Sequence, residues 1–119
     1  MAEHGTIRIP DEEYKQRVQR AAKILQREGL DALIVNSNEA DYANARYFSG
    51  FWPLFERCGV AISPAGDAAL MVGPESREFG ADRCKLDKVF VLKAYRESAD
   101  PAYPELQADT YQDVFNALG

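Results

Sequence analysis

The sequence predicts a single α/β domain in which helices flank a layered, mixed β-sheet. Two observations lead to this fold class: segments with helical periodicity alternate with short apolar runs typical of buried strands, and one pair of such runs flanks a turn typical of a β-hairpin. A chain of 119 residues, 46% apolar and 28% charged, has the composition of one globular domain with one core.

The first predicted helix begins near Asp11, after a flexible lead-in over residues 1–9, and opens the domain expected over residues 10–119. The acidic residues after Pro10 suit the positive end of a helix. Gly29 can adopt the left-handed conformation that ends it. Apolar side chains recur at helical spacing, which predicts an amphipathic helix covering a sheet, at Tyr14, Val18, Ala21, Ala22 and Leu25.

A strand and a second helix are expected next. Residues 32–36 are apolar without alternation, a pattern typical of a strand buried on both faces, so we expect a central strand. Ser37 or Asn38 can cap a helix over about residues 39–47, and Gly50 would end it. The residues expected to face inward on this helix are Ala40, Ala43 and Tyr47.

The next two strands form the predicted hairpin. Apolar runs over residues 58–62 and 68–72 flank a turn that contains Pro64 and Gly66. Proline fixes φ near about −65°, and glycine permits a tight return of the chain, so these two runs should pair as adjacent strands.

Three further elements complete the prediction. After the Gly-Pro pair at residues 73–74, residues 75–84 are expected to form a short helix and residues 88–92 an apolar strand. A last helix should begin near Thr110, after a loop rich in Pro, Ala, Asp and Tyr. Since a helix usually leads into another strand, we expect the chain to be the front part of a longer protein.

Composition excludes several classes of protein. The net charge is −5 and no block of basic residues could neutralise a run of phosphates, so we expect no nucleic-acid partner. No apolar run approaches the roughly twenty residues that a membrane helix needs, so we expect no membrane partner. Cys58 and Cys84 lack the spacing of a zinc site or a disulfide framework, and the N-terminus lacks a signal peptide, so a cytoplasmic protein is expected.

The common catalytic motifs are absent: the chain has no nucleophile elbow, phosphate loop, zinc-protease helix or dinucleotide-binding turn. His4, the single histidine, is expected to be a solvated tail residue rather than a ligand. Asp31, Glu39 and Asp41 could hold a metal ion, but surface charge near a helix start explains them better. No residue of this chain is predicted to be catalytic or to bind metal.

Residues 51–57, which follow Gly50 and which we call the aromatic segment, are the strongest candidate for a binding site. Its rings, including Trp52 and Phe55, could be core or could cover the apolar part of a ligand. Glu56 and Arg57 suggest that part of the segment is exposed, and an arginine can pair with a carboxylate through two parallel hydrogen bonds. Such a loop suits recognition of a small acid or of a peptide terminus.

Residues 14–92 resemble the N-terminal domain shared by creatinase, prolidase (Xaa-Pro dipeptidase) and aminopeptidase P. One matching motif is Arg-Glu-Gly-Leu-Asp-Ala-Leu-Ile-Val over residues 27–35, where a helix ends and a hydrophobic strand follows. The other is Asn-Ala-Arg-Tyr-Phe-Ser-Gly-Phe over residues 44–51. The hairpin and the Gly-Pro pair at residues 73–74 follow in the order seen in this family.

The resemblance implies a ribonuclease H-like α/β domain without catalytic machinery of its own. In this family the chemistry belongs to a second, pita-bread domain, where peptidase members hold two divalent metal ions (Mn, Co or Zn), whereas creatinase works without metal. The expected partners are therefore the C-terminal catalytic domain of the same protein, a second copy in a homodimer, and a small peptide or amide substrate. The parent protein would be a metallopeptidase-like hydrolase or a creatinase-like amidinohydrolase, and this chain alone would be inactive.

Three residues are the predicted substrate contacts. In creatinase-like members an aromatic residue and an arginine shortly after the Ser-Gly pair approach the substrate, and Phe55 and Arg57 lie at about that place, with Trp52 nearby. Arg57 could equally make a structural ion pair. Two other functions remain open: a freestanding interaction or small-ligand-binding module, and a small thiol enzyme using Cys58. A thiol enzyme is disfavoured because neighbours on a strand face opposite sides, which separates Cys58 from the Arg57 that would activate it.

Overall fold

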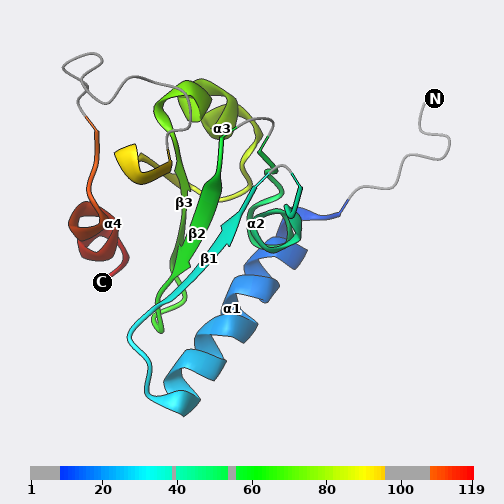
Figure 1. Ribbon diagram of the computed structural model, residues 1–119. Coiled ribbons are helices and arrows are strands. Elements are labelled where there is room, and N and C mark those ends of the chain that lie inside the picture. The colour runs from blue at the N-terminus through cyan, green and yellow to red at the C-terminus, as the bar shows by residue number, and fades with distance from the viewer. Residues whose placement is uncertain (1–8, 39, 54–55, 96–107) are drawn as a thin grey trace, which may run out of the picture.

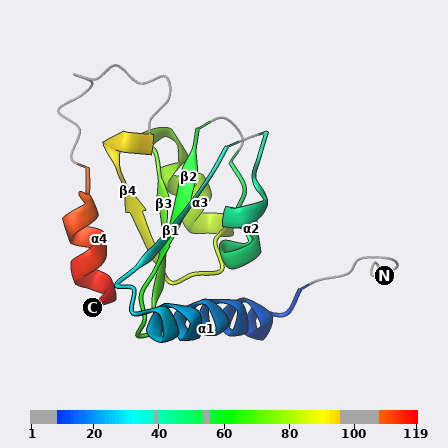
Figure 2. The same cartoon turned by 60° about the horizontal axis from the view of Figure 1, so that its bottom comes forward.

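The computed structural model describes residues 9–38, 40–53, 56–95 and 108–119, and it confirms the predicted α/β class. Within these ranges a four-stranded sheet forms the central layer. Figure 1 shows helices α1, α2 and α3 on one side of the sheet and α4 on the other, and Figure 2 shows α1 running beneath the sheet. Among the described helices, none is long and apolar enough to cross a membrane.

Helix α1 (Asp11–Glu28) begins and ends where the sequence predicts. Three acidic residues occupy its first turn, and Gly29 ends it in the left-handed region with φ 69°. The predicted apolar stripe is confirmed, because its five members are all buried against the sheet: Tyr14, Val18, Ala21, Ala22 and Leu25.

The sheet has the order β1 (Leu33–Ser37), β2 (Cys58–Ile62), β3 (Ala68–Val72) and β4 (Lys88–Val91). Strand β2 is antiparallel to both β1 and β3, so the predicted hairpin of β2 and β3 is confirmed, and β4 runs parallel to β3. Parallel pairing of β3 with β4 requires a crossover connection, which the helical segment over residues 74–83 provides. One row of apolar side chains crosses all four strands, through Val35, Val60, Leu70 and Val89.

The prediction that β1 is a central strand buried on both faces is wrong. In the part of the chain that the structure describes, β1 pairs only with β2 and forms an edge of the sheet. Its burial alternates, and Ile34 remains 36% exposed. The face that carries Leu33 and Val35 packs against the core beneath α1 and α2, whereas on the opposite face of the sheet α4 packs over β3. An apolar run therefore did not distinguish a central from an edge strand.

Helix α2 (Ala43–Ser49) is displaced relative to the predicted range of residues 39–47. The expected inward residues are wrong as a result: Ala45 and Ser49 are the buried positions, whereas Ala40, Ala43 and Tyr47 are exposed. The displacement has a local cause, since the Asn38 side chain accepts hydrogen bonds from the backbone N–H groups of residues 40 and 41, which forms a turn before the helix.

Both predicted capping residues do take part, in different ways. Asn38 holds the turn, whereas Ser37 accepts a hydrogen bond from the backbone N–H of Ala45 at 2.9 Å, although Ser37 lies in β1 rather than beside the helix. This bond ties the first turn of α2 to the end of the strand. As predicted, Gly50 ends α2 with φ 73°.

The remaining elements confirm the sequence reading. A 3₁₀ turn η1 (Pro74–Ser76) leads into α3 (Arg77–Arg83), and a second 3₁₀ turn η2 (Lys93–Tyr95) follows β4. Helix α4 (Tyr111–Leu118) is capped by Thr110, whose side chain and that of Asp113 bond each other's backbone N–H groups in a capping box.

The core has two parts, one on each face of the sheet. The larger part lies beneath α1 and α2 and includes Phe51 from the aromatic segment. The smaller part lies beneath α4, where Val114 and Leu118 contact Ala69 and Met71 of β3. Since the aromatic segment follows α2 and leads into β2, its two ends are fixed by the larger core and by the sheet.

Candidate functional site

The aromatic segment starts from a buried anchor at the end of α2. The Ser49 hydroxyl, fully buried, donates to the carbonyl of Ala45 at 2.6 Å and accepts the N–H of Phe51 at 3.1 Å. Phe51 is 1% exposed and belongs to the core. The first ring of the segment is therefore a packing residue, and the segment leaves the core only after it.

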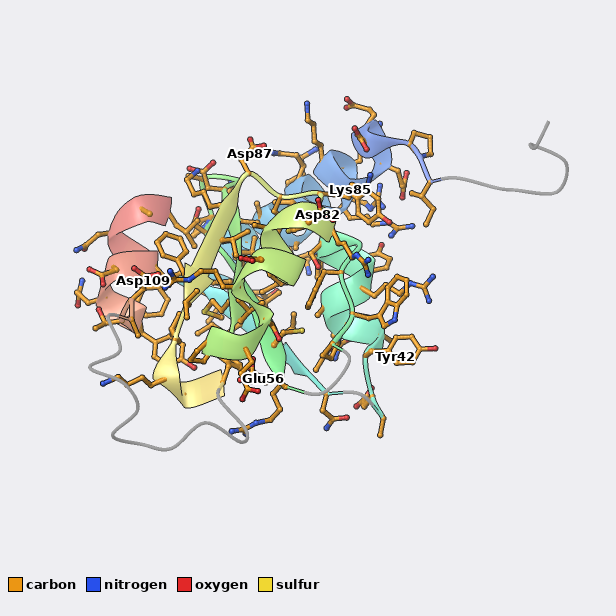
Figure 3. The ribbon with its side chains drawn as sticks, turned by 90° about the horizontal axis from the view of Figure 1, so that it is seen from above. Tyr42, Glu56, Asp82, Lys85, Asp87 and Asp109 are labelled. Atoms are coloured by element: carbon orange, nitrogen blue, oxygen red, sulfur yellow. The ribbon has the colours of Figure 1, made fainter. Side chains whose placement is uncertain are left out.

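Trp52 lies on the surface and packs against an arginine of α2. The indole is 43% exposed, and the guanidinium carbon of Arg46 lies 4.4 Å from its ring centroid. Tyr42 is 40% exposed, and its ring centroid lies 5.9 Å from the same carbon. Tyr42, Arg46 and Trp52 thus form one exposed surface, which we call the α2 surface, and Figure 3 shows Tyr42 pointing away from the body of the molecule.

Glu56 is buried, contrary to the expectation that Glu56 and Arg57 mark an exposed part of the segment. Its side chain is 1% exposed, and its Oε1 accepts a hydrogen bond from the Ser76 hydroxyl at 3.0 Å. Figure 3 shows the carboxylate beneath the ribbon that carries η1 and α3. The charge of Glu56 suggested exposure. Its burial could not be predicted locally, because the hydrogen-bond partner, Ser76, lies 20 residues further along the chain.

Arg57 is exposed as expected and is held by one contact to the backbone. Its Nη2 donates to the carbonyl of Ala94 in η2 at 3.1 Å. A guanidinium has five N–H donors in a planar fork. The bond to Ala94 orients the side chain with one of these donors, and the other donors of Arg57 can bind a ligand. Arg57 and Trp52 therefore have different partners, while Phe55, the third predicted contact, lies outside the described residues.

A cluster of hydroxyl and amide groups lies close to Arg57. Tyr95, 4% exposed, donates its hydroxyl hydrogen to Asn36 Oδ1 at 2.6 Å, and the hydroxyl of Tyr111 lies 3.3 Å from that of Tyr95. Burial, and then the hydrogen bond with Tyr111, raises the pKa of Tyr95 well above its usual value, so Tyr95 stays protonated as a donor. The cluster joins the end of β1 to η2 and α4.

Cys58 is buried, as the sequence predicts, and Cys84 is partly buried. Cys58 is 1% exposed, and burial raises the pKa of Cys58 to about 12 and that of Cys84 to about 11. Their folded-state pKa values lie above the reference value of 9.0, so the stability they contribute is present below pH 9.0 and is lost as the pH rises toward about 12.

These thiols are expected to react slowly in the native chain. At pH 8, iodoacetamide should alkylate them at least about tenfold more slowly than it alkylates the urea-unfolded chain, because little thiolate is present and burial limits access. Mass spectrometry of timed samples measures both rates. Equal rates in the native and unfolded chains would contradict this and would reopen the thiol-enzyme hypothesis.

A groove lies between α1 and the turns beside β3 and β4. It is a half-open groove of about 250 Å³, and Figure 3 shows two of its lining residues, Lys85 and Asp87, at one end of the sheet. Two of its three lysines have acidic neighbours: Lys85 lies 3.6 Å from Asp11, and Lys88 lies 3.7 Å from Asp67. The charges in the groove are thus largely compensated, which makes it a weaker site than the aromatic segment.

No group of three or more His, Cys, Asp or Glu side chains arranged to hold a metal ion occurs in the described ranges. Asp31 and Asp41, weighed above as ligands, are both exposed, and Glu39 lies outside those ranges, as does His4. The residue that sequence reasoning missed is Arg46. Its signal was the spacing of four residues from Tyr42, which places the two side chains together at the start of a helix.

Comparison with known protein families identifies one that matches this chain. The family described as the creatinase/prolidase N-terminal domain matches residues 17–119. No curated protein matches the sequence.

Two solved structures have a similar fold. One is the N-terminal, creatinase/prolidase-like domain of a Corynebacterium diphtheriae protein assigned as a metallopeptidase, with a TM-score of 0.54 and 16% identity over 66% of this chain. The other is an Xaa-Pro aminopeptidase from Streptococcus pyogenes, with a TM-score of 0.56 and 18% identity over 71% of this chain. The matches span 59% and 60% of those two chains, and at these identities they show the fold alone.

Proposed function

Because the chain belongs to the creatinase/prolidase N-terminal domain family, we propose that it is the noncatalytic N-terminal domain of a hydrolase acting on Xaa-Pro peptides or on creatine-like amides. The observation that carries this proposal is the family match over residues 17–119, which begins within α1 and includes every described element after it. In this proposal the domain contributes to dimerisation and shapes the substrate site of the hydrolase, whose catalytic domain lies elsewhere in the same protein.

The proposed substrate-contacting residues are Phe55, Arg57 and Trp52. For Arg57 the support is its position: it is exposed, it immediately precedes β2, and the carbonyl of Ala94 orients it. Buried Glu56, bonded to Ser76, fixes the residue next to it, so the backbone that carries Arg57 starts from a rigid point. A guanidinium held in this way can offer its remaining donors to a carboxylate or carbonyl oxygen of a substrate.

Divalent metal ions (Mn, Co or Zn), where the parent hydrolase uses them, would be held by the catalytic domain and would activate water there. The role proposed for the present chain is limited to binding and orientation. Its side chains would contact the substrate from the open side of a site whose reacting groups lie in the other domain, across the interface of a homodimer.

Replacing Arg57 tests the substrate-shaping role in the longer protein that carries this domain. Arg57→Ala should raise KM for the substrate by about 10- to 100-fold, the range expected when one charge-assisted hydrogen-bonding group is lost, with a smaller effect on kcat. Arg57→Lys should recover only part of the affinity, because lysine lacks the planar fork. Steady-state kinetics at several substrate concentrations separate the two constants.

A surface arginine in α1 provides the matched control. Arg27 is exposed and pairs only with the neighbouring Glu28 among the described contacts, so Arg27→Ala should leave both constants unchanged. Unchanged kinetics in Arg57→Ala as well would remove Arg57 from the substrate site.

The second candidate function, a freestanding interaction or small-ligand-binding module, is favoured by the exposed rings of the α2 surface. The two candidates are separated by the coding sequence that follows the codon for Gly119. A catalytic domain with two aspartates, a histidine and two glutamates as metal ligands would support the hydrolase, and a stop codon at that point would support the freestanding module.

A further inference from the structure

Two arginines stack on aromatic rings near α2, but their surroundings differ. Arg17 of α1 lies 4.3 Å from the ring centroid of Tyr47, and its donors are used: Nε bonds Glu13 at 3.1 Å and Nη1 bonds the carbonyl of Tyr47 at 2.8 Å. Arg17 is therefore a structural residue that joins α1 to α2.

Arg46 also lies close to two aromatic rings, but its guanidinium lacks the hydrogen-bond acceptors that Arg17 has among the described residues. Its guanidinium carbon lies 4.4 Å from the ring centroid of Trp52 and 5.9 Å from that of Tyr42, and within the described part of the chain no carboxylate or carbonyl group accepts from it. Stacking occupies the faces of the planar group and leaves its N–H edge free for in-plane hydrogen bonds. The rings hold the guanidinium in place, so less conformational freedom is lost when an acceptor binds.

The chemistry of the α2 surface matches that of protein-interface hot spots, which are enriched in Trp, Tyr and Arg. All three residues are exposed, with Tyr42 and Trp52 at 40% and 43%. An arginine edge beside two aromatic rings complements one planar carboxylate, whose apolar stem the rings can cover. Recognition of phosphorylated segments, by contrast, uses clusters of arginines.

We propose that the α2 surface is a docking site for an acidic segment of a protein partner, with Arg46 binding one Asp or Glu carboxylate between Tyr42 and Trp52. This proposal does not rest on the proposed function, because it concerns Arg46 and a protein partner rather than Arg57 and a substrate. In it the indole of Trp52 forms a wall of the docking site.

Trp52 is the only tryptophan of the chain, so its fluorescence reports directly on this surface. The experiment titrates the chain with the blocked peptide acetyl-Ala-Glu-Ala-amide and, at equal ionic strength, with acetyl-Ala-Gln-Ala-amide. The Arg Nε–H resonances are followed by NMR in parallel, up to about 20 mM peptide, which detects millimolar dissociation constants. We expect a saturable response of Trp52 and of one Arg resonance to the Glu peptide, at least about tenfold weaker for the Gln peptide.

Two variants complete the test. Arg46→Gln should abolish the response while leaving the circular dichroism spectrum unchanged, since Arg46 is exposed. Arg17→Gln, which removes the other stacked arginine, should retain the response. The proposal is overturned by no response to the Glu peptide, by an equal response to both peptides, by a response that persists in Arg46→Gln, or by tighter binding of a phosphoserine peptide.

Discussion

Gly59→Ala is expected to destabilise the fold by about 2–3 kcal/mol, although the change adds a single methyl group. Gly59 lies in β2 beneath the ring of Tyr95, and a Cβ at this position would lie 2.5 Å from the Tyr95 hydroxyl oxygen and 3.0 Å from Cζ. The same Cβ would lie 3.0 Å from Asn36 Oδ1, the acceptor of the Tyr95 hydroxyl. The ring must therefore move, and the hydrogen bond to Asn36 breaks with it.

Urea unfolding followed by Trp52 fluorescence measures this loss, and two controls identify its cause. The first is a double-mutant cycle: Tyr95→Phe removes the oxygen that a new Cβ meets, so Gly59→Ala should cost less in the Tyr95→Phe background. The second is Gly29→Ala, where a Cβ has no neighbour within 4 Å and the cost of about 1 kcal/mol comes only from the positive φ of 69°. Equal costs with and without the Tyr95 hydroxyl would contradict the steric explanation.

Glu56→Ala is expected to destabilise the fold by about 2–3 kcal/mol, combining a cavity in a buried site with the loss of the acceptor for Ser76. The site has little room to close, because the Glu56 carboxylate packs directly against the backbone of Gly73. Glu56→Gln keeps the volume and an acceptor oxygen, so its cost should be smaller. The same urea unfolding measurement applies.

Glu78→Ala provides the control for Glu56, because Glu78 is an exposed glutamate in the first turn of α3 and its loss should cost no more than about 0.5 kcal/mol. A cost for Glu56→Ala within that same range would show that burial of the carboxylate and its bond to Ser76 contribute little to stability. In the longer protein, Glu56→Ala should also raise KM, since it releases the backbone next to Arg57.

The elements that the sequence predicts well are those whose signals are local. The apolar stripe of α1 needs only the helical repeat and the glycine that ends it, and the hairpin needs only two apolar runs and a turn with Pro64 and Gly66. The resemblance to the creatinase/prolidase N-terminal domain also rests on two short, ordered motifs, and the family match confirms it.

The features that the sequence does not predict depend on strand order or on which side chains meet in the folded chain. Residues 32–36 are apolar in either an edge or a central strand, and only the strand order shows that β1 lies at the edge. The start of α2 depends on the turn around Asn38. Burial of Glu56 depends on Ser76, and the contact of Arg46 with an aromatic ring depends on Trp52 returning to α2 after Gly50. Among the predicted substrate contacts, Trp52 and Arg57 are exposed, and their role stays a prediction.

The central claim, that this chain is a noncatalytic domain, is tested most directly by assaying the purified 119-residue chain for hydrolysis of Xaa-Pro dipeptides and of creatine with Mn²⁺, Co²⁺ or Zn²⁺ added. We expect a rate indistinguishable from that of buffer containing the same metal ion. Saturable hydrolysis that scales with the concentration of the chain and is lost on heat denaturation would contradict it.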